Sequence, residues 1–120
     1  MLYHGTSAAS AERLLEAGWQ PRSGSMGSQC GDPRLLYLTD QPMNALWFAE
    51  QKQDPVVLEV RMPRGALCLD PEDGVGETVE EEIAISERHG LPTNLATGCA
   101  LTPDCFRLVE PASPEYDPSP

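Results

Sequence analysis

Proline and glycine interrupt this chain so often that its helices and strands must be short. The sequence has 120 residues, of which 12 are proline and 10 are glycine, and both residue types mark turns. A chain of this length can form one compact domain with a modest core. We expect that domain to span residues 1–110. Residues 111–120 hold four prolines and no apolar periodicity, which predicts a disordered tail.

Apolar patterns between these breaks predict a mixture of helices and strands. Ser7 can cap a helix over residues 8–17 that Gly18 ends, and Pro42 can open a second helix over 43–51. A third helix is expected over residues 77–89. Besides the strand that leads into His4, we expect strands over residues 35–39, 55–62, 66–69, 97–101 and 105–109. The pattern predicts an α+β domain with strands packed against two or three short helices.

The chain is strongly acidic, with a formal net charge of −11. General binding to nucleic acid needs clustered lysines and arginines, so we do not expect it. The acidity leaves open a decoy role, in which acidic side chains imitate a polyanion. No apolar run approaches the roughly 18 residues of a membrane helix, and no signal-peptide pattern precedes the domain. We therefore expect a cytoplasmic protein that does not bind membranes.

The cysteines do not form a pattern that suits a metal. They are Cys30, Cys68, Cys99 and Cys105. No CxxC pair occurs, and the only histidines are His4 and His89, so we expect no zinc or other metal site. Reduced, buried thiols are typical of a cytoplasmic protein.

Two strand ends could carry chemistry: His4-Gly5-Thr6 and Tyr37-Leu38-Thr39. Gly5 lacks a Cβ, so a ligand could press against the main chain beside the His4 imidazole. On neighbouring strands, His4 and Tyr37 would face a common cleft suited to a flat, polar ligand. The simpler alternative is structural: His4 caps or packs at a strand–helix junction, and Tyr37 is a core tyrosine.

The order and spacing of several short segments favour the functional interpretation. These segments are Tyr3-His4-Gly5-Thr6, Leu36-Tyr37-Leu38-Thr39, Ala45-x-x-Phe48-Ala49, Val57-Leu-Glu-Val60 and Leu101-Thr-Pro-Asp-Cys-Phe-Arg-Leu-Val109. Together they resemble the ADP-ribosyltransferase superfamily, in the histidine–tyrosine branch shared by diphtheria toxin and the poly-ADP-ribose polymerases. The resemblance covers most of residues 2–110. It implies a compact, split β-sheet core and NAD as the substrate.

The resemblance also implies roles for individual residues. His4 would hydrogen-bond the nicotinamide-side ribose of NAD, and the Gly5 main chain would hold the nicotinamide carboxamide, with Thr6 supporting that turn. Tyr37 would stack on the nicotinamide ring. Nicotinamide leaves the ribose through an oxocarbenium-like state, so such a site mainly orients and stabilises charge.

Two more residues would complete this binding site. Thr39 would brace the strand end, and Phe48 belongs to the helix that would back the pocket. The family's usual glutamate, which opens the penultimate strand, has no counterpart here. Counting back from Pro103 puts Thr97 or Gly98 at its position.

Three explanations for the missing glutamate stay open. Glu82, in the acidic run 80–82, could supply the catalytic carboxylate, although such a run also suits a solvated helix N-terminus. Alternatively Thr97 occupies the position, or the site binds without turnover. The leading expectation is an NAD-dependent mono-ADP-ribosyltransferase of toxin or effector type that modifies a macromolecule, expected to be a protein. NAD hydrolysis is a related possibility, and an inactive NAD- or ADP-ribose-binding protein, or an acidic inhibitor of the same fold, is the alternative.

Overall fold

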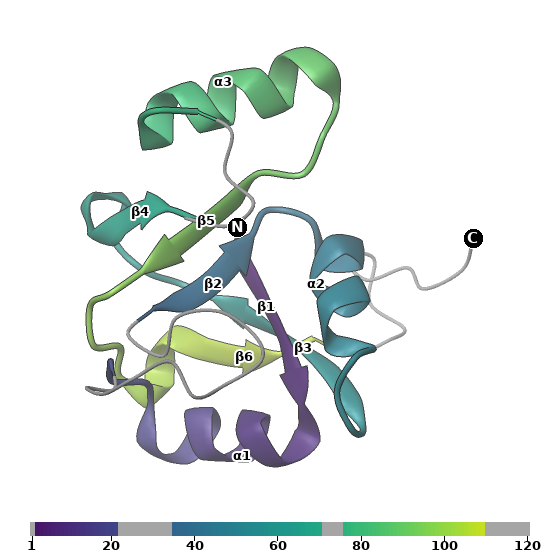
Figure 1. The fold of residues 1–120 in the computed structure, drawn as a ribbon. Helices are drawn as coiled ribbons and strands as arrows, with labels where there is room; N and C mark the ends of the chain where they lie inside the picture. The colour runs from purple at the N-terminus through teal and green to yellow at the C-terminus, as the bar shows by residue number, and fades with distance from the viewer. Residues whose placement is uncertain (1, 22–34, 71–75, 110–120) are drawn as a thin grey trace.

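The computed structural model describes residues 2–21, 35–70 and 76–109, so the expected tail at 111–120 lies outside the described residues. Within them, six strands form one antiparallel sheet in the order β4-β5-β2-β1-β3-β6, accompanied by three helices (Figure 1). The predicted α+β class and helix number are confirmed. None of the helices described is long and apolar enough to cross a membrane. The elements are β1 Leu2–Ser7, α1 Ala8–Ala17, β2 Leu36–Thr39, α2 Pro42–Ala49, β3 Pro55–Val60, η1 Arg64–Ala66, β4 Leu67–Leu69, α3 Val79–His89, β5 Asn94–Thr97, η2 Pro103–Cys105 and β6 Phe106–Leu108.

The predicted first helix is confirmed: α1 covers Ala8–Ala17, with Ser7 as its N-cap and Gly18 as its C-cap. The Ser7 hydroxyl accepts a hydrogen bond from the Ser10 amide at 3.2 Å, which satisfies one of the open N–H groups of the first turn. Gly18 ends the helix at a φ of 76°, a conformation that favours glycine. The helix buries Ala11 and Leu14 against one face of the sheet.

The two faces of the sheet carry separate apolar clusters. The cluster under α1 contains Ala11, Leu14, Leu36, Leu38, Leu58, Val60, Leu101 and Phe106. The cluster under α2 contains Tyr3, Ala45, Leu46, Val57 and Val109. Because successive residues of a strand point to opposite faces, β3 is buried on both sides and anchors the domain.

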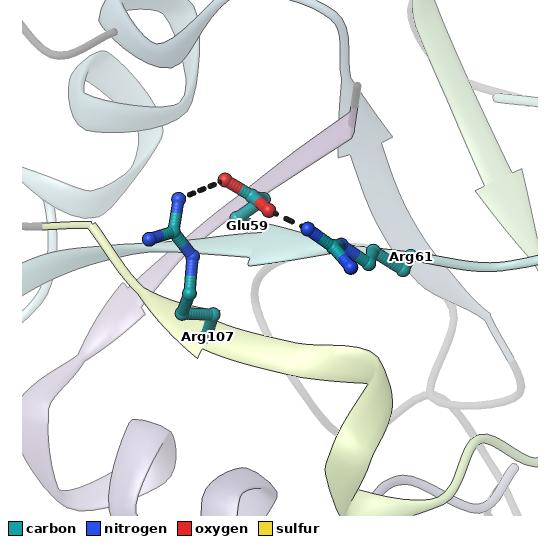
Figure 2. Close-up of polar contacts among 3 residues, drawn as sticks. All are labelled: Glu59, Arg61 and Arg107. Atoms are coloured by element: carbon teal, nitrogen blue, oxygen red, sulfur yellow. Dashed lines mark hydrogen bonds and ion pairs between the residues drawn. The ribbon is translucent and has the colours of Figure 1, made fainter. Parts of the chain in front are cut away.

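One buried carboxylate interrupts the apolar side chains of β3. Glu59 lies opposite Arg107 of β6, whose Nη2 is 2.6 Å from Glu59 Oε2. Arg61 approaches from the other side, with its Nε 3.5 Å from Oε1 (Figure 2). The arginines are exposed and the carboxylate is buried, so two surface cations neutralise one interior charge. The Arg107 guanidinium is the chief reason that the pKa of Glu59 lies below its usual value.

The penultimate strand differs from its prediction. We expected a strand over residues 97–101, but β5 ends at Thr97. Thr93 fixes its start, because the Thr93 amide donates to Asp40 Oδ1 at 2.8 Å and its carbonyl accepts from the Asp40 amide at 3.3 Å. The Cys99 amide donates to the Thr97 hydroxyl at 3.1 Å and turns the chain away. The spacing of apolar residues carries no information about these side-chain hydrogen bonds. The pattern therefore predicted the wrong start and end for this strand.

Candidate functional site

Strand β1 is joined very differently to its two neighbours. Six consecutive residue pairs, from Leu2↔Val60 to Ser7↔Pro55, connect it to β3. In the part of the chain that the structure describes, a single pair, Tyr3↔Thr39, connects it to β2. Beyond this pair the ladder between β1 and β2 is open, and we call this opening the split.

The His4 imidazole spans the split. Its Nδ1 lies 2.8 Å from the main-chain carbonyl oxygen of Tyr37. A carbonyl oxygen only accepts, so Nδ1 carries the hydrogen and, in the neutral ring, Nε2 is a hydrogen-bond acceptor. Burial lowers the pKa of His4 below 6.5; the bond to Tyr37 opposes that effect and the positive charge of Lys52 adds to it. His4 is therefore neutral at pH 7.

The main chain of Gly5 faces the split. Val57, the partner of Gly5 on β3, accepts a hydrogen bond from the Val109 amide at 3.0 Å, so the main-chain groups of Val57 point toward β6. In an antiparallel ladder the N–H and C=O of one residue share a side. Gly5 and Val57 are therefore a pair without mutual hydrogen bonds, and the N–H and C=O of Gly5 point the other way, toward β2.

The space left by the missing Cβ of Gly5 is taken by α2 and not by a ligand. A Cβ at Gly5 would lie 1.8 Å from the carbonyl oxygen of Ala45 and 3.1 Å from the Cβ of Ala49. The glycine is thus required for helix packing. This corrects the expectation that a ligand presses on the main chain where the Cβ is absent; the main chain is open at its β2 edge instead.

Side chains on the two faces of the split differ in character. Leu36 and Leu38 point into the cluster under α1, so Tyr37 between them points to the α2 side. Asn44 of α2 reaches β2 and β5, and Phe48 follows it by one turn on the same flank of the helix. His4 alternates with Tyr3 and Gly5, which face α2, and so lies on the α1 side. The structure brings the His4 ring to the main chain of Tyr37, with the two side chains on opposite faces.

Three predicted threonines have structural partners. Thr39 accepts a hydrogen bond from Asn44 Nδ2 at 3.0 Å, and Thr6 is buried beside its β3 partner Val56. Thr97 is fully buried, donates to the Ala66 carbonyl at 2.8 Å and accepts from Cys99. The Thr97 hydroxyl thus makes two hydrogen bonds within the protein, and its expected place in the NAD site stays a prediction.

Glu82 does not lie beside His4 and Tyr37. It is buried on α3, and its Oε1 accepts the Gly76 amide at 2.7 Å. Helix α3 packs on β4, the edge strand that β5 and β2 separate from β1. In Figure 1 this helix stands beyond β4 and β5, on the far side from α1. The bond to Gly76 ties Glu82 to the segment before α3, and its expected catalytic role stays a prediction.

Two asparagines that the sequence interpretation missed lie on the Tyr37 side of the split. Asn94 opens β5 and pairs with Thr39, while Ala96 pairs with Tyr37. Asn44 Nδ2 donates at 3.0 Å to both Thr39 Oγ1 and Asn94 Oδ1. The available signal was Pro92, which marks a break just before Thr93-Asn94; counting back from Pro103 overlooked it.

No protein-family model matches this chain, and no curated protein matches it. Among residues 2–21, 35–70 and 76–109, no group of three or more histidine, cysteine, aspartate and glutamate side chains is placed to hold a metal ion.

Proposed function

We propose that this protein is an NAD-dependent mono-ADP-ribosyltransferase with the split-sheet core of that superfamily. It would release nicotinamide from NAD and transfer ADP-ribose to a macromolecular acceptor, a protein. The observation that carries the proposal is the split, where the N–H and C=O of Gly5 face β2 while the His4 ring spans to Tyr37.

The nicotinamide carboxamide suits the open edge of Gly5. A primary amide has one carbonyl acceptor and two N–H donors, which complement the N–H and C=O of a strand edge. Tyr37 and Phe48 lie on the α2 side, where aromatic rings can stack on a flat heterocycle. This arrangement supports binding of nicotinamide as a short extension of the sheet.

His4 suits the ribose. Its neutral ring offers Nε2 as an acceptor for a ribose hydroxyl, and fixing Nδ1 on Tyr37 sets the orientation of the ring. In the reaction the C1′–N bond breaks and its electron pair leaves with nicotinamide. An acceptor lone pair then bonds to C1′, and the acceptor proton passes to solvent or to a base. A neutral imidazole avoids repelling the positive charge that develops on the ribose.

Under this proposal Asn94, which opens β5, takes the position that the family gives to glutamate. Its carboxamide can hold a ribose hydroxyl, but it cannot take a proton from the acceptor at neutral pH. Asn94 pairs with Asn44, which is also neutral, so we expect slow transfer. The same observation favours a second candidate function, an NAD- or ADP-ribose-binding protein without turnover.

The test is nicotinamide release from NAD by the purified protein, with a cell lysate as acceptor and mass spectrometry of the products. His4→Asn is the informative variant, because an asparagine amide can still donate toward Tyr37 but lacks an acceptor at the Nε2 position. His89→Asn, at the exposed end of α3, is the matched control. Calorimetric titration with NAD measures binding separately from chemistry.

Each outcome assigns one function. Release that is lost in His4→Asn and kept in His89→Asn supports the enzyme, and a mass gain on a lysate protein makes it a transferase instead of a hydrolase. Binding of NAD without release supports the second candidate. Absence of both binding and release contradicts both.

A further inference from the structure

Helix α2 has an exposed apolar face opposite the side that packs on the sheet. Ala45 and Ala49 are buried over β1. On the other side of the helix, Trp47 is 59% exposed and Met43, one turn earlier, is 39% exposed. Glu50, also exposed, follows Trp47 by three residues on the same side. We call Met43, Trp47 and Glu50 the α2 outer face.

Trp47 is held in place while remaining exposed. Its ring contacts the Phe48 ring edge-on, with the centroids 5.0 Å apart and the planes at 78°. Tryptophan is among the residues most enriched as anchors of protein interfaces. The other exposed large apolar residues lie on other parts of the described structure and do not make a pair of this kind: Leu15, Leu91 and Leu108.

Charge selects the occupant of this face. With a net charge of −11, the protein repels nucleic acid, an anionic membrane and a second copy of itself over a Debye length of about 8 Å at physiological salt. Two apolar side chains also cover far less than the roughly 800 Å² per partner of a stable interface, which argues against a stable dimer of this chain through this face. A positively charged partner gains attraction in addition to apolar contact, and Glu50 supplies a local charge for it.

We propose that the α2 outer face docks a basic, amphipathic segment of a partner protein. Apolar side chains of that segment cover Met43 and Trp47, and a lysine or arginine meets Glu50. Binding here needs no NAD and is independent of the proposed transfer reaction.

The experiment titrates the full chain with a synthetic helical peptide of leucine and lysine in amphipathic spacing. Fluorescence reports on Trp47 in a Trp19→Phe background, since these are the two tryptophans. We expect saturable binding, emission shifted to shorter wavelength, and weakening by salt. Trp47→Ser should weaken binding at least about tenfold, measured by calorimetry. Leu91→Ser, which removes an exposed apolar side chain after α3, should leave it unchanged.

Three results would overturn the proposal. One is equal binding of a leucine–glutamate peptide with the same spacing, because charge would then not select the partner. The second is an equal effect of Trp47→Ser and Leu91→Ser, or no effect of either, with both variants folded by circular dichroism. The third is self-association in sedimentation equilibrium that Trp47→Ser abolishes, since the occupant would be a second copy. None of these results bears on nicotinamide release, so the two proposals fail separately.

Discussion

The two edges of β1 show how one strand can act as scaffold and as candidate site. Toward β3 the strand is paired along its whole length, over Leu2–Ser7. Toward β2 it is joined at Tyr3↔Thr39 alone within the described chain. The paired edge fixes the position of the main chain, and the open edge then presents that main chain in a defined geometry.

The open edge is unusual because main-chain polar groups inside a sheet normally bond to the next strand. Beyond Tyr3 the contact between β1 and β2 is made by a side chain, His4, which donates to the carbonyl of Tyr37. A main-chain edge of this kind is useful only when a ligand or water satisfies it. We expect substitutions that disturb the packing around the paired edge to cost more stability than substitutions at the open edge.

Gly5→Ala should have the largest effect. The new Cβ would overlap the Ala45 carbonyl oxygen, at 1.8 Å, so α2 must move away from β1. We expect a loss of about 3 kcal/mol in the free energy of unfolding, measured by urea denaturation. Gly65→Ala is the control, because a Cβ there meets nothing within 4 Å and should change stability by less than about 0.5 kcal/mol. Equal stability of the two variants would contradict the described packing of α2.

Arg107→Ala should have the next largest effect, because it leaves the Glu59 carboxylate buried without its closest cation (Figure 2). We expect the free energy of unfolding at pH 7 to fall by about 2 kcal/mol. Arg61→Ala, whose contact is longer at 3.5 Å, should cost less than about 1 kcal/mol.

Glu59 also makes this edge sensitive to acid. Its pKa is lower in the folded protein than its ordinary value of 4.5, chiefly because of Arg107. The stabilisation by the ionised Glu59 carboxylate is complete above pH 4.5. It is lost as the pH falls below 4.5, since the unfolded chain binds the proton more readily. Glu59→Gln should therefore reduce the loss of stability between pH 5 and pH 3, measured by urea titrations. An unchanged pH dependence would show that the fold does not lower the pKa of Glu59.

Features of the fold that depend on neighbouring residues could be predicted from the sequence, and features that depend on distant residues could not. Helix α1 was predictable because Ser7, Gly18 and the apolar spacing between them act locally. The start of β5 at Asn94 was not, because it depends on a bond from the Thr93 amide to Asp40, 53 residues away in the chain. Likewise, nothing in the local pattern of β3 indicates that Glu59 is buried, since its partner Arg107 lies 48 residues later.

The candidate site divides in the same way. His4, Gly5 and Tyr37 could be named from short segments, although they lie inside β1 and β2 and not at the strand ends that the sequence suggested. Asn44 and Asn94 could not, because 50 residues separate them and their contact exists only after α2 and β5 assemble. For Glu82, the helical pattern predicted that the side chain points inward, as its burial confirms, but not which part of the molecule lies there.

On the open side, Asn44→Ala should lower the free energy of unfolding by about 1 kcal/mol, because Asn44 donates hydrogen bonds to both Thr39 and Asn94. Asn94→Ala should cost a similar amount. If the two asparagines act as a pair, the double variant should lose less than the sum of the single losses. Denaturant unfolding of the three variants and the wild type measures this coupling, and strict additivity would show that the pair contributes no joint stability.

The smallest effect should come from the protonation of His4. Its pKa is lower in the folded protein than the ordinary value of 6.5, chiefly through burial, so the unfolded chain takes up the proton more readily. Stability therefore rises with pH around that value, and the contribution of His4 is lost as the pH falls from 7 toward 5. His4→Asn retains a donor toward Tyr37 but cannot titrate, so it should show a flatter profile over this range than the wild type. If His4→Asn and the wild type lose stability equally between pH 7 and pH 5, the fold does not lower the pKa of His4.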